Sequence, residues 1–246
     1  MRALDDLKTA TAFLTRLPLA APEGGSIARA GWAFPIIGLA VGALGGLVFE
    51  LTLALGLTPF IAAMLAVAAT MLVTGALHED GLADTADGFG GGASPARKLE
   101  IMRDSNIGAY GVLALIVTFS LKVGALASIG DPLLAAIALM TAHIAARAAL
   151  PAFMFAVKPA RADGLSAHAG RPPVRSVAIA GALGVLALGL GLDPIRGVAA
   201  LFLIVLAGLI FARLSVRQIG GQTGDVLGAL EQCAEILVLL TAAALF

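Results

Sequence analysis

The sequence is poor in the residues that a water-soluble domain of this size uses at its surface and in its cross-links. Only 13% of its 246 residues are charged, against about 25% in an average soluble domain. It has one cysteine, Cys233, which excludes an intramolecular disulfide and a cysteine-based metal site. Its 16 basic and 16 acidic residues cancel, so no net charge favours binding to nucleic acid.

Long apolar runs take the place of the missing charge. Hydrophobic residues make up 59% of the chain, and several runs approach the roughly 17 to 25 residues that a helix needs to cross a bilayer. Hydropathy predicts six spans and a weaker seventh: 31–55, 59–77, 108–129, 132–157, 177–192, 195–211 and 226–246. We therefore expect an all-α integral membrane protein, a bundle of about six or seven transmembrane helices in the lipid bilayer.

A short amphipathic segment precedes the first span. Its apolar residues fall roughly on one side of a helix that ends at Pro18: Leu4, Leu7, Phe13, Leu14 and Leu17. The pattern is typical of a helix lying in the membrane interface, and an ordinary cap helix is the alternative. Because the sequence has no evident repeat, we expect one membrane domain over 1–246, with 1–30 as its interfacial N-terminal segment.

Basic residues are distributed unevenly between the two sides of the predicted bundle. Of the 16 Lys and Arg residues, all but Lys122, Arg147 and Arg196 lie in the N-terminal segment or in alternate connections. Basic residues stay on the cytoplasmic side during insertion, so we expect a cytoplasmic N-terminus in a bacterial inner membrane. The acidic motif regions 78–107 and 213–231 then face the cytoplasm. The opposite connections are tight turns: Thr58-Pro59, Asp131-Pro132 and Asp193-Pro194.

Three features inside the spans indicate how the helices pack. Glycine recurs every four residues in the first span, at Gly38, Gly42 and Gly46, which predicts close approach of a neighbouring helix. His143 and Arg147 are one turn apart in apolar surroundings, so Arg147 must face the bundle interior or a wet cavity, where it is a candidate for substrate binding. Lys122 is expected to extend its ammonium group towards the membrane boundary.

The densest group of polar residues, His78 to Gly92, follows the second span. If the helix continues through it, Asp80, Asp84 and Asp87 are spaced i, i+4 and i+7, and their carboxylates share one face. Their mutual repulsion favours a bound cation, and oxygen ligands select magnesium, manganese or calcium. A solvated acidic helix end is the alternative. His78 is able to ligate a metal or shuttle a proton, but a hydrogen bond to a neighbour is the commoner role.

A second acidic cluster lies near the end of the chain, on the same predicted side. Thr223 or Asp225 is suited to cap the last helix, and Glu231 and Glu235 are one turn apart. Asp225 with either glutamate would complete a second cation site. The alternative is a capped helix whose first turns carry acids that complement the helix dipole.

Arginines stand near both acidic clusters. Arg103 precedes the third span, and Arg161 follows the fourth. Guanidinium groups fit phosphate oxygens bidentately, so both residues are candidates for holding phosphates that a metal bridges. The alternative is that they only anchor the loops at the cytoplasmic surface.

Segments spread over nearly the whole chain carry a family resemblance. In chain order they are Phe13-Leu14-Thr15-Arg16-Leu17-Pro18, Phe34-Pro35-Ile36-Ile37-Gly38, His78 to Gly88, Met102-Arg103-Asp104-Ser105, Gly108-Ala109-Tyr110-Gly111, Arg161 to Leu165, Thr223-Gly224-Asp225 and Gly228-Ala229. In these segments the chain resembles the cobalamin synthase family, the adenosylcobinamide-GDP ribazoletransferases. One departure is Glu79, where the family tends to have an apolar residue, and it leaves the aspartate spacing intact.

The resemblance implies a membrane transferase of cobalamin biosynthesis. Its reaction would join α-ribazole, or its 5′-phosphate, to the cobinamide-side phosphorus of adenosylcobinamide-GDP and expel GMP, with Mg²⁺ as cofactor. Asp80, Asp84 and Asp87 would hold magnesium, Asp225 would assist or act as base, and Glu231 would add a ligand. The catalytic residues would then be Asp84 and Asp225. The residues that bind substrate and phosphate would be Arg16, Arg103, Arg161, Arg147 and His78. Partners would include a second copy of the chain or other cobalamin-pathway enzymes.

Two other functions compete with this interpretation. A CDP-alcohol phosphotransferase-like enzyme also places aspartates at helix ends, but its full aspartate and Ala-Arg pattern is not found in this sequence. A cation-coupled transporter would also put carboxylates in the membrane, yet it should bury them near the midplane, whereas these lie at one edge. A structural scaffold would explain the glycines but not three acids on one face.

Overall fold

The computed structural model describes residues 2–244, and the regular structure in this part of the chain is helical, as the composition predicts. In chain order the helices are α1 (Arg2–Leu14), α2 (Ile27–Ala30), the 3₁₀ helix η1 (Gly31–Ala33), α3 (Phe34–Ala54), α4 (Pro59–Thr74), α5 (Leu77–Gly91), α6 (Pro95–Ile101), α7 (Ala109–Ile129), α8 (Pro132–Ala156), α9 (Leu165–Ala169), α10 (Val174–Gly191), α11 (Pro194–Ile219) and α12 (Gly224–Ala243).

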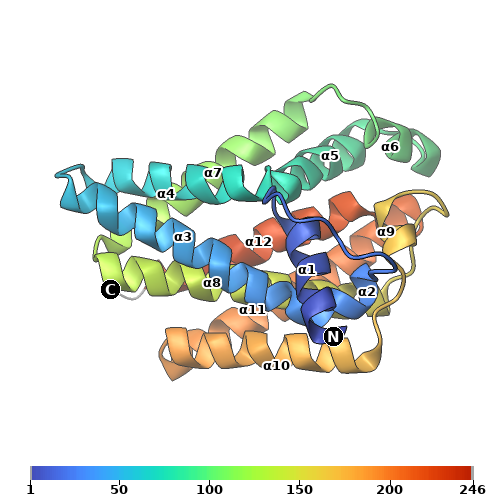
Figure 1. Ribbon diagram of the computed structural model, residues 1–246. Helices are drawn as coiled ribbons and strands as arrows, with labels where there is room; N and C mark the ends of the chain where they lie inside the picture. The colour runs from blue at the N-terminus through green and yellow to red at the C-terminus, as the bar shows by residue number, and fades with distance from the viewer. Residues whose placement is uncertain (1, 245–246) are drawn as a thin grey trace.

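The long helices form one membrane bundle (Figure 1). Within the described residues, six helices are long and apolar enough to cross a bilayer, or seven if α4 and α5 count as one bent span. The predicted all-α membrane fold is therefore confirmed. Helix α11 continues past the predicted end at 211 to Ile219, because hydropathy marks where apolar residues stop and not where the helix stops. Residues 245–246 of the predicted seventh span lie outside the described part.

Helix α12 is the most enclosed of the spans. About 67% of its most apolar window is buried in protein, against 22% for α10 and for α11. A helix that faces protein on most sides can carry polar residues that a lipid-facing helix cannot. This burial explains why hydropathy gave only a weak signal for this span.

The short turns at one end of the bundle are built as the sequence predicts. Each following helix starts with proline, and the residue before it caps the helix through its side chain. The Asp131 carboxylate accepts a hydrogen bond from the Leu134 amide at 2.9 Å, and the Asp193 carboxylate accepts from the Ile195 amide at 3.0 Å. The connections 15–26, 92–108, 157–173 and 220–223 lie at the other end, which we call the loop-rich end (Figure 1).

The glycine stripe of α3 packs against α8, as predicted. A Cβ atom added to Gly42 would lie 2.6 Å from the Met140 Cα atom, and one added to Gly46 would lie 2.6 Å from the Ala136 Cβ atom. Both distances are too short for a side chain, so the two backbones approach as closely as they do only because these positions are glycine.

Helix α1 crosses the bundle at the loop-rich end (Figure 1). It ends at Leu14, four residues before Pro18, and Leu14 is buried while Leu4 is exposed. The Asp6 carboxylate accepts hydrogen bonds from the Arg29 guanidinium at 2.7 Å and from the Trp32 indole at 3.1 Å. These contacts join the N-terminal segment to the start of the first span.

A sharp bend separates α4 from α5. The two helices meet at 90°, and both residues at the break, Gly75 and Ala76, have left-handed backbone angles, with φ of 66° and 55°. Such a conformation is unfavourable for alanine, so the surrounding packing must hold it. The bend turns α5 away from the direction of α4 and directs the acidic residues towards α12.

Candidate functional site

The site begins with the close contact between α5 and α12. A Cβ atom on Gly81 would lie 3.0 Å from the Asp225 Cα atom, and one on Gly228 would lie 3.0 Å from the His78 carbonyl oxygen. Helix α5 is continuous, so Asp80 and Asp84 stand one turn apart on either side of Gly81. The two acidic clusters of the sequence therefore meet at the loop-rich end.

The carboxylates of α5 and α12 lie close enough to repel one another electrostatically. The charges that act on Asp84 are the negative charges of Asp80, Asp225 and Asp87 and the positive charge of Arg161. Within the described residues, neither the Asp80 carboxylate nor the Asp84 carboxylate has a hydrogen-bond or ion-pair partner. Two oxygen-donor groups thus remain available beside Asp225 for a hard cation.

Asp87 has a different set of partners. Its two carboxylate oxygens accept hydrogen bonds from the backbone amides of Gly108, at 2.7 Å, and Gly111, at 2.9 Å. These amides belong to the start of α7, where a helix has unpaired N–H groups. Asp87 therefore fixes α7 against α5, and its lone pairs are partly occupied by that role.

Arg161 reaches Asp225 from the connection after α8. This connection lies alongside the residues before α12: the Gln222 amide donates to the Lys158 carbonyl oxygen at 2.9 Å, and the Ala160 amide donates to the Gln222 carbonyl oxygen at 2.8 Å. The Arg161 guanidinium lies 3.8 Å from the Asp225 carboxylate, and its Nη1 atom is buried without a hydrogen-bond partner. A buried, unpaired donor of this kind suits an anionic ligand oxygen.

Arg103 lies further out and contacts the same connection. Its guanidinium donates to the Asp163 carboxylate at 2.5 Å, across two exposed side chains. A hydrogen bond from the backbone and then the charge of Arg103 hold the pKa of Asp163 below its usual value. A phosphate at Arg103 would have to share this guanidinium with Asp163.

Arg16, the remaining arginine of the predicted binding set, lies over the α4–α5 bend. Its backbone amide donates to the Val73 carbonyl oxygen at 2.7 Å, and its side chain occupies the space that a Cβ atom on Gly75 would need. The structure therefore places Arg16 where it supports the bend that orients α5.

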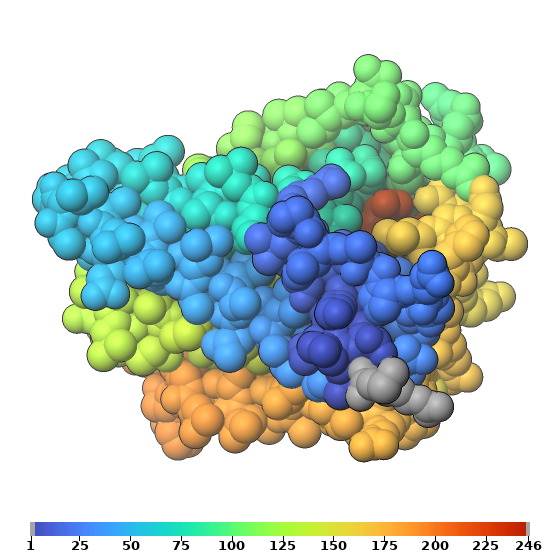
Figure 2. All heavy atoms as spheres, in the orientation of Figure 1, coloured from blue at the N-terminus to red at the C-terminus, as the bar shows by residue number. Residues whose placement is uncertain are grey.

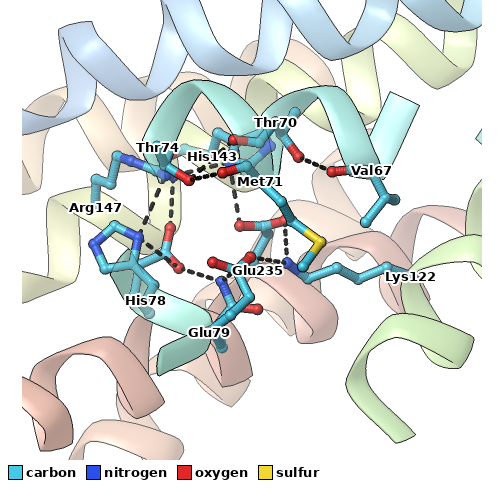
Figure 3. A network of polar contacts seen from close by, with 12 residues as sticks. Val67, Thr70, Met71, Thr74, His78, Glu79, Lys122, His143, Arg147 and Glu235 are labelled. Atoms are coloured by element: carbon cyan, nitrogen blue, oxygen red, sulfur yellow. Dashed lines mark hydrogen bonds and ion pairs between the residues drawn. The ribbon is translucent and has the colours of Figure 1, made fainter. Parts of the chain in front are cut away.

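The predicted residues His78 and Arg147 lie deeper, in a buried ionic network (Figure 3), and both contact Glu231. The Arg147 guanidinium lies 2.6 Å from the Glu231 carboxylate, and the His78 ring nitrogen lies 3.3 Å from the same carboxylate. The three side chains are almost completely buried. Among the described residues, Glu231 contacts Arg147, His78 and Gln232, whereas Asp225 contacts Thr223 and Arg161.

The other half of the network centres on Glu235. Lys122 lies 2.8 Å and His143 lies 3.1 Å from its carboxylate, and Lys122 lies 3.7 Å from Glu79. The expected extension of Lys122 to the membrane boundary is therefore wrong: its side chain is 3% exposed. These two carboxylates inside the bundle attract the ammonium group more strongly than distant water does.

The network also contains a metal-like arrangement. Among the described residues, His143, Glu231 and Glu235 have ligand atoms within 4.8 Å of one another. Arg147 and Lys122 already contact these carboxylates. The positive charges of Arg147 and Lys122 thus already neutralise the carboxylates that would otherwise ligate a metal ion. The arrangement is best described as an ion-pair network.

Sequence reasoning missed Glu79, Lys122 and Gln232 as members of this network. The Gln232 amide donates to the Glu79 carboxylate at 3.1 Å and to the Glu231 carboxylate at 3.0 Å. A signal was present, because Glu231 and Glu235 have the same one-turn spacing as His143 and Arg147. Matching the two pairs would have required knowing that α8 and α12 are neighbours.

A cavity of about 430 Å³ is lined both by Asp80, from the carboxylates near Asp225, and by residues of the buried ionic network. Its walls are largely apolar, and its polar positions are Glu79, Asp80, Thr118, Lys122 and Gln232. The apolar part is lined by Val67, Met71, Ala76, Ala83, Ile107, Leu115, Ile116 and Phe119. The volume lies within the range of about 300–1,000 Å³ typical of small-molecule sites.

Figure 2 shows part of the C-terminal region, in red, within a hollow between the green and gold segments that follow α5 and α8. The fold and this site define a class: a polytopic helical membrane protein with carboxylates, an arginine and a small-molecule cavity at one end of its bundle. The family model described as cobalamin-5-phosphate synthase matches residues 6–243, and the chain belongs to this family.

Named relatives agree with this assignment. An adenosylcobinamide-GDP ribazoletransferase of Bradyrhizobium diazoefficiens is 60% identical over 242 residues, covering 97% of this chain and 93% of that protein. Proteins with the same name from Mesorhizobium japonicum and Azorhizobium caulinodans are 48% and 45% identical, each with 97% of this chain covered and with 93% and 95% of their own lengths. No solved structure matches the chain.

Proposed function

We propose that this protein is a transferase that joins the cobinamide-phosphate group of adenosylcobinamide-GDP to α-ribazole or its 5′-phosphate and releases GMP. The observation that carries the proposal is the meeting of Asp80, Asp84, Asp225 and Arg161 in a chain whose full-length relatives bear this name. The family membership supports the substrates, and the geometry supports the assignment of roles.

The reaction exchanges one phosphorus–oxygen bond for another. A ribose hydroxyl of the acceptor forms a bond to the cobinamide-side phosphorus, and the bond from that phosphorus to the oxygen bridging the two phosphates breaks, so GMP leaves. The hydroxyl proton passes to the Asp225 carboxylate, which we assign as base because it faces both α5 and Arg161. Arg161, with its unpartnered Nη1 atom, is positioned to hold a phosphate oxygen.

Magnesium is part of the proposal. Asp80 and Asp84 offer carboxylate oxygens without side-chain partners among the described residues, close enough to Asp225 for the three charges to interact. This fits Mg²⁺, which usually keeps several waters and uses one or two carboxylates together with substrate phosphates. When bound there, it neutralises charge on the pyrophosphate. We assign Asp84 to contact with the reacting groups, Asp87 to positioning through α7, and Glu231 to the buried network.

The cavity beside Asp80 is our assignment for the acceptor base. The base of ribazole is a flat, mostly apolar heteroaromatic ring, and the walls contributed by Leu115 and Phe119 suit such a ring. Lys122 at the inner end has a donor available for a ring nitrogen, since an ammonium group has three. The base would then lie in the cavity while its ribose points to Asp80.

We further place the protein in a bacterial inner membrane with the loop-rich end in the cytoplasm. The basic residues concentrated at that end support this orientation. A nucleotide-activated substrate is then present on the side where the carboxylates lie.

The test is product formation by purified protein in lipid nanodiscs. Adenosylcobinamide-GDP with α-ribazole should give equimolar GMP and adenosylcobalamin, and omission of either substrate should abolish both. A CDP-alcohol with a lipid acceptor serves as the competing substrate pair. Turnover of that pair, with none of the corrinoid, would replace the proposal with the phospholipid-type reaction.

A further inference from the structure

A groove on the outside of the bundle carries an unpaired basic cluster. Lys158, Arg213 and Arg217 line one cavity of about 770 Å³ between α8 and α11. All three side chains are exposed, and within the described residues none has a hydrogen-bond or ion-pair partner for its charge. We call these three residues the basic cluster.

The basic cluster is unfavourable without an anion. Arg213 and Arg217 are one turn apart on α11, and like charges at this spacing repel each other. Lys158 adds a third positive charge to the same cavity. Two other arginines at this end have carboxylate partners, Arg103 with Asp163 and Arg29 with Asp6. At the basic cluster, an anion from outside the chain would supply the negative charge that Asp163 and Asp6 supply to those arginines.

Below the basic cluster the groove becomes entirely apolar. Ala156, Val157, Leu209 and Ala212 line both this groove and a second cavity of about 330 Å³. That second cavity lies between α8, α10, α11 and α12 and is lined by apolar side chains and glycines. Gly181 and Gly208 are among its lining residues, and an added Cβ atom at either one would meet only open space. The two cavities together form a channel with a cationic head and an apolar tail.

We propose that this channel binds an anionic phospholipid, with its headgroup phosphate on the basic cluster and an acyl chain in the apolar cavity. Basic pockets between transmembrane helices bind acidic lipid headgroups in this manner. A soluble anion would use the cluster but leave the apolar cavity unfilled. The shape of the channel therefore favours a lipid over a free phosphate.

The proposed lipid site is linked by the backbone to the carboxylate site. Lys158 belongs to the segment that pairs with Gln222 and carries Arg161 to Asp225. A lipid that fixes the Lys158 side chain would also restrict this segment.

The experiment measures lipid binding by delipidated full-length protein in neutral detergent. Native mass spectrometry and thermal unfolding would compare phosphatidylglycerol with phosphatidylcholine of identical acyl chains. We expect wild type to prefer phosphatidylglycerol, and the Lys158→Gln, Arg213→Gln, Arg217→Gln triple variant to bind it at least about tenfold more weakly. A control triple variant, Lys8→Gln, Arg97→Gln, Arg175→Gln, removes equal charge elsewhere and should keep the preference.

A second variant tests the apolar half without changing charge. Gly181→Leu with Gly208→Leu fills open space on two helices and improves helix propensity, so it should fold and yet lose lipid binding. Equal binding of the two lipids, or unchanged preference in the triple variant, would overturn the proposal. Full stabilisation by inorganic phosphate or by soluble glycerophosphoglycerol would also overturn it and identify a simple anion site.

Discussion

Gly81 of α5 lies against the backbone of Asp225 of α12, so closely that an added Cβ atom would be 2.9 Å from the Asp225 carbonyl oxygen. The helix turn that carries Asp80 and Asp84 lies this close to the start of α12 because position 81 has no side chain. The site is thus built on helix packing as much as on its carboxylates.

The first prediction concerns this contact. Gly81→Ala should reduce GMP release at least about tenfold, because the new methyl group forces α5 and α12 apart and displaces Asp225 from Asp84. Gly124→Ala on α7 is the control, since it meets open space and should raise stability by up to about 1 kcal/mol through helix propensity. Equal activity in the two variants would show that the close packing is unimportant for turnover.

The second prediction separates two aspartates of one helix. Asp87→Ala should lower the free energy of unfolding by about 1–2 kcal/mol, because the amides of Gly108 and Gly111 lose their acceptor. Asp84→Asn should leave stability unchanged and reduce turnover. Thermal unfolding beside an activity assay checks both. An Asp87 variant that is fully stable but inactive would instead make Asp87 a direct member of the site.

The third prediction concerns the buried pair of Arg147 and Glu231. Arg147→Met alone should destabilise the protein by about 3–5 kcal/mol, because it leaves Glu231 buried beside fewer cations. The double variant Arg147→Met, Glu231→Leu should recover much of that loss. Chemical unfolding in mixed micelles measures the cycle, and simple additivity of the two changes would argue against a coupled network.

The fourth prediction addresses the acceptor cavity. Leu115→Trp narrows the cavity and should raise KM for α-ribazole about tenfold while KM for adenosylcobinamide-GDP stays the same. A ribazole analogue without the two ring methyl groups should restore the lower KM. Val117→Trp, exposed on the same helix, is the control. An increase in both KM values would place the base elsewhere.

The sequence predicted those parts of the protein that depend on local pattern. Spans follow from apolar runs, turns from proline with its capping residue, and the α3 packing face from the glycine spacing. The distribution of basic residues predicted that the two acidic clusters lie on the same side, but their contact through Gly81 and Asp225 appears only in the structure. The roles of Asp80, Asp84 and Asp225 in metal binding and catalysis remain predictions.

Contacts between distant helices were harder to predict. Lys122 lies inside the bundle because Glu235 and Glu79 face it, and neither is near it in sequence. The Glu79 carboxylate likewise accepts from Gln232, which is distant in sequence, and faces Lys122. Tertiary packing decides which residues become the partners of a buried charge. The pattern of a single sequence does not contain this information.

The central claim is that the carboxylates at the α5–α12 contact bind magnesium and drive the transfer. The most direct measurement is the magnesium dependence of GMP release by wild type, Asp84→Asn and Asp87→Asn, each shown to be folded. We expect wild-type activity to require magnesium and Asp84→Asn to lose about 100-fold or more, with a much smaller loss in Asp87→Asn. Magnesium-independent turnover, or full activity in Asp84→Asn, would contradict the account.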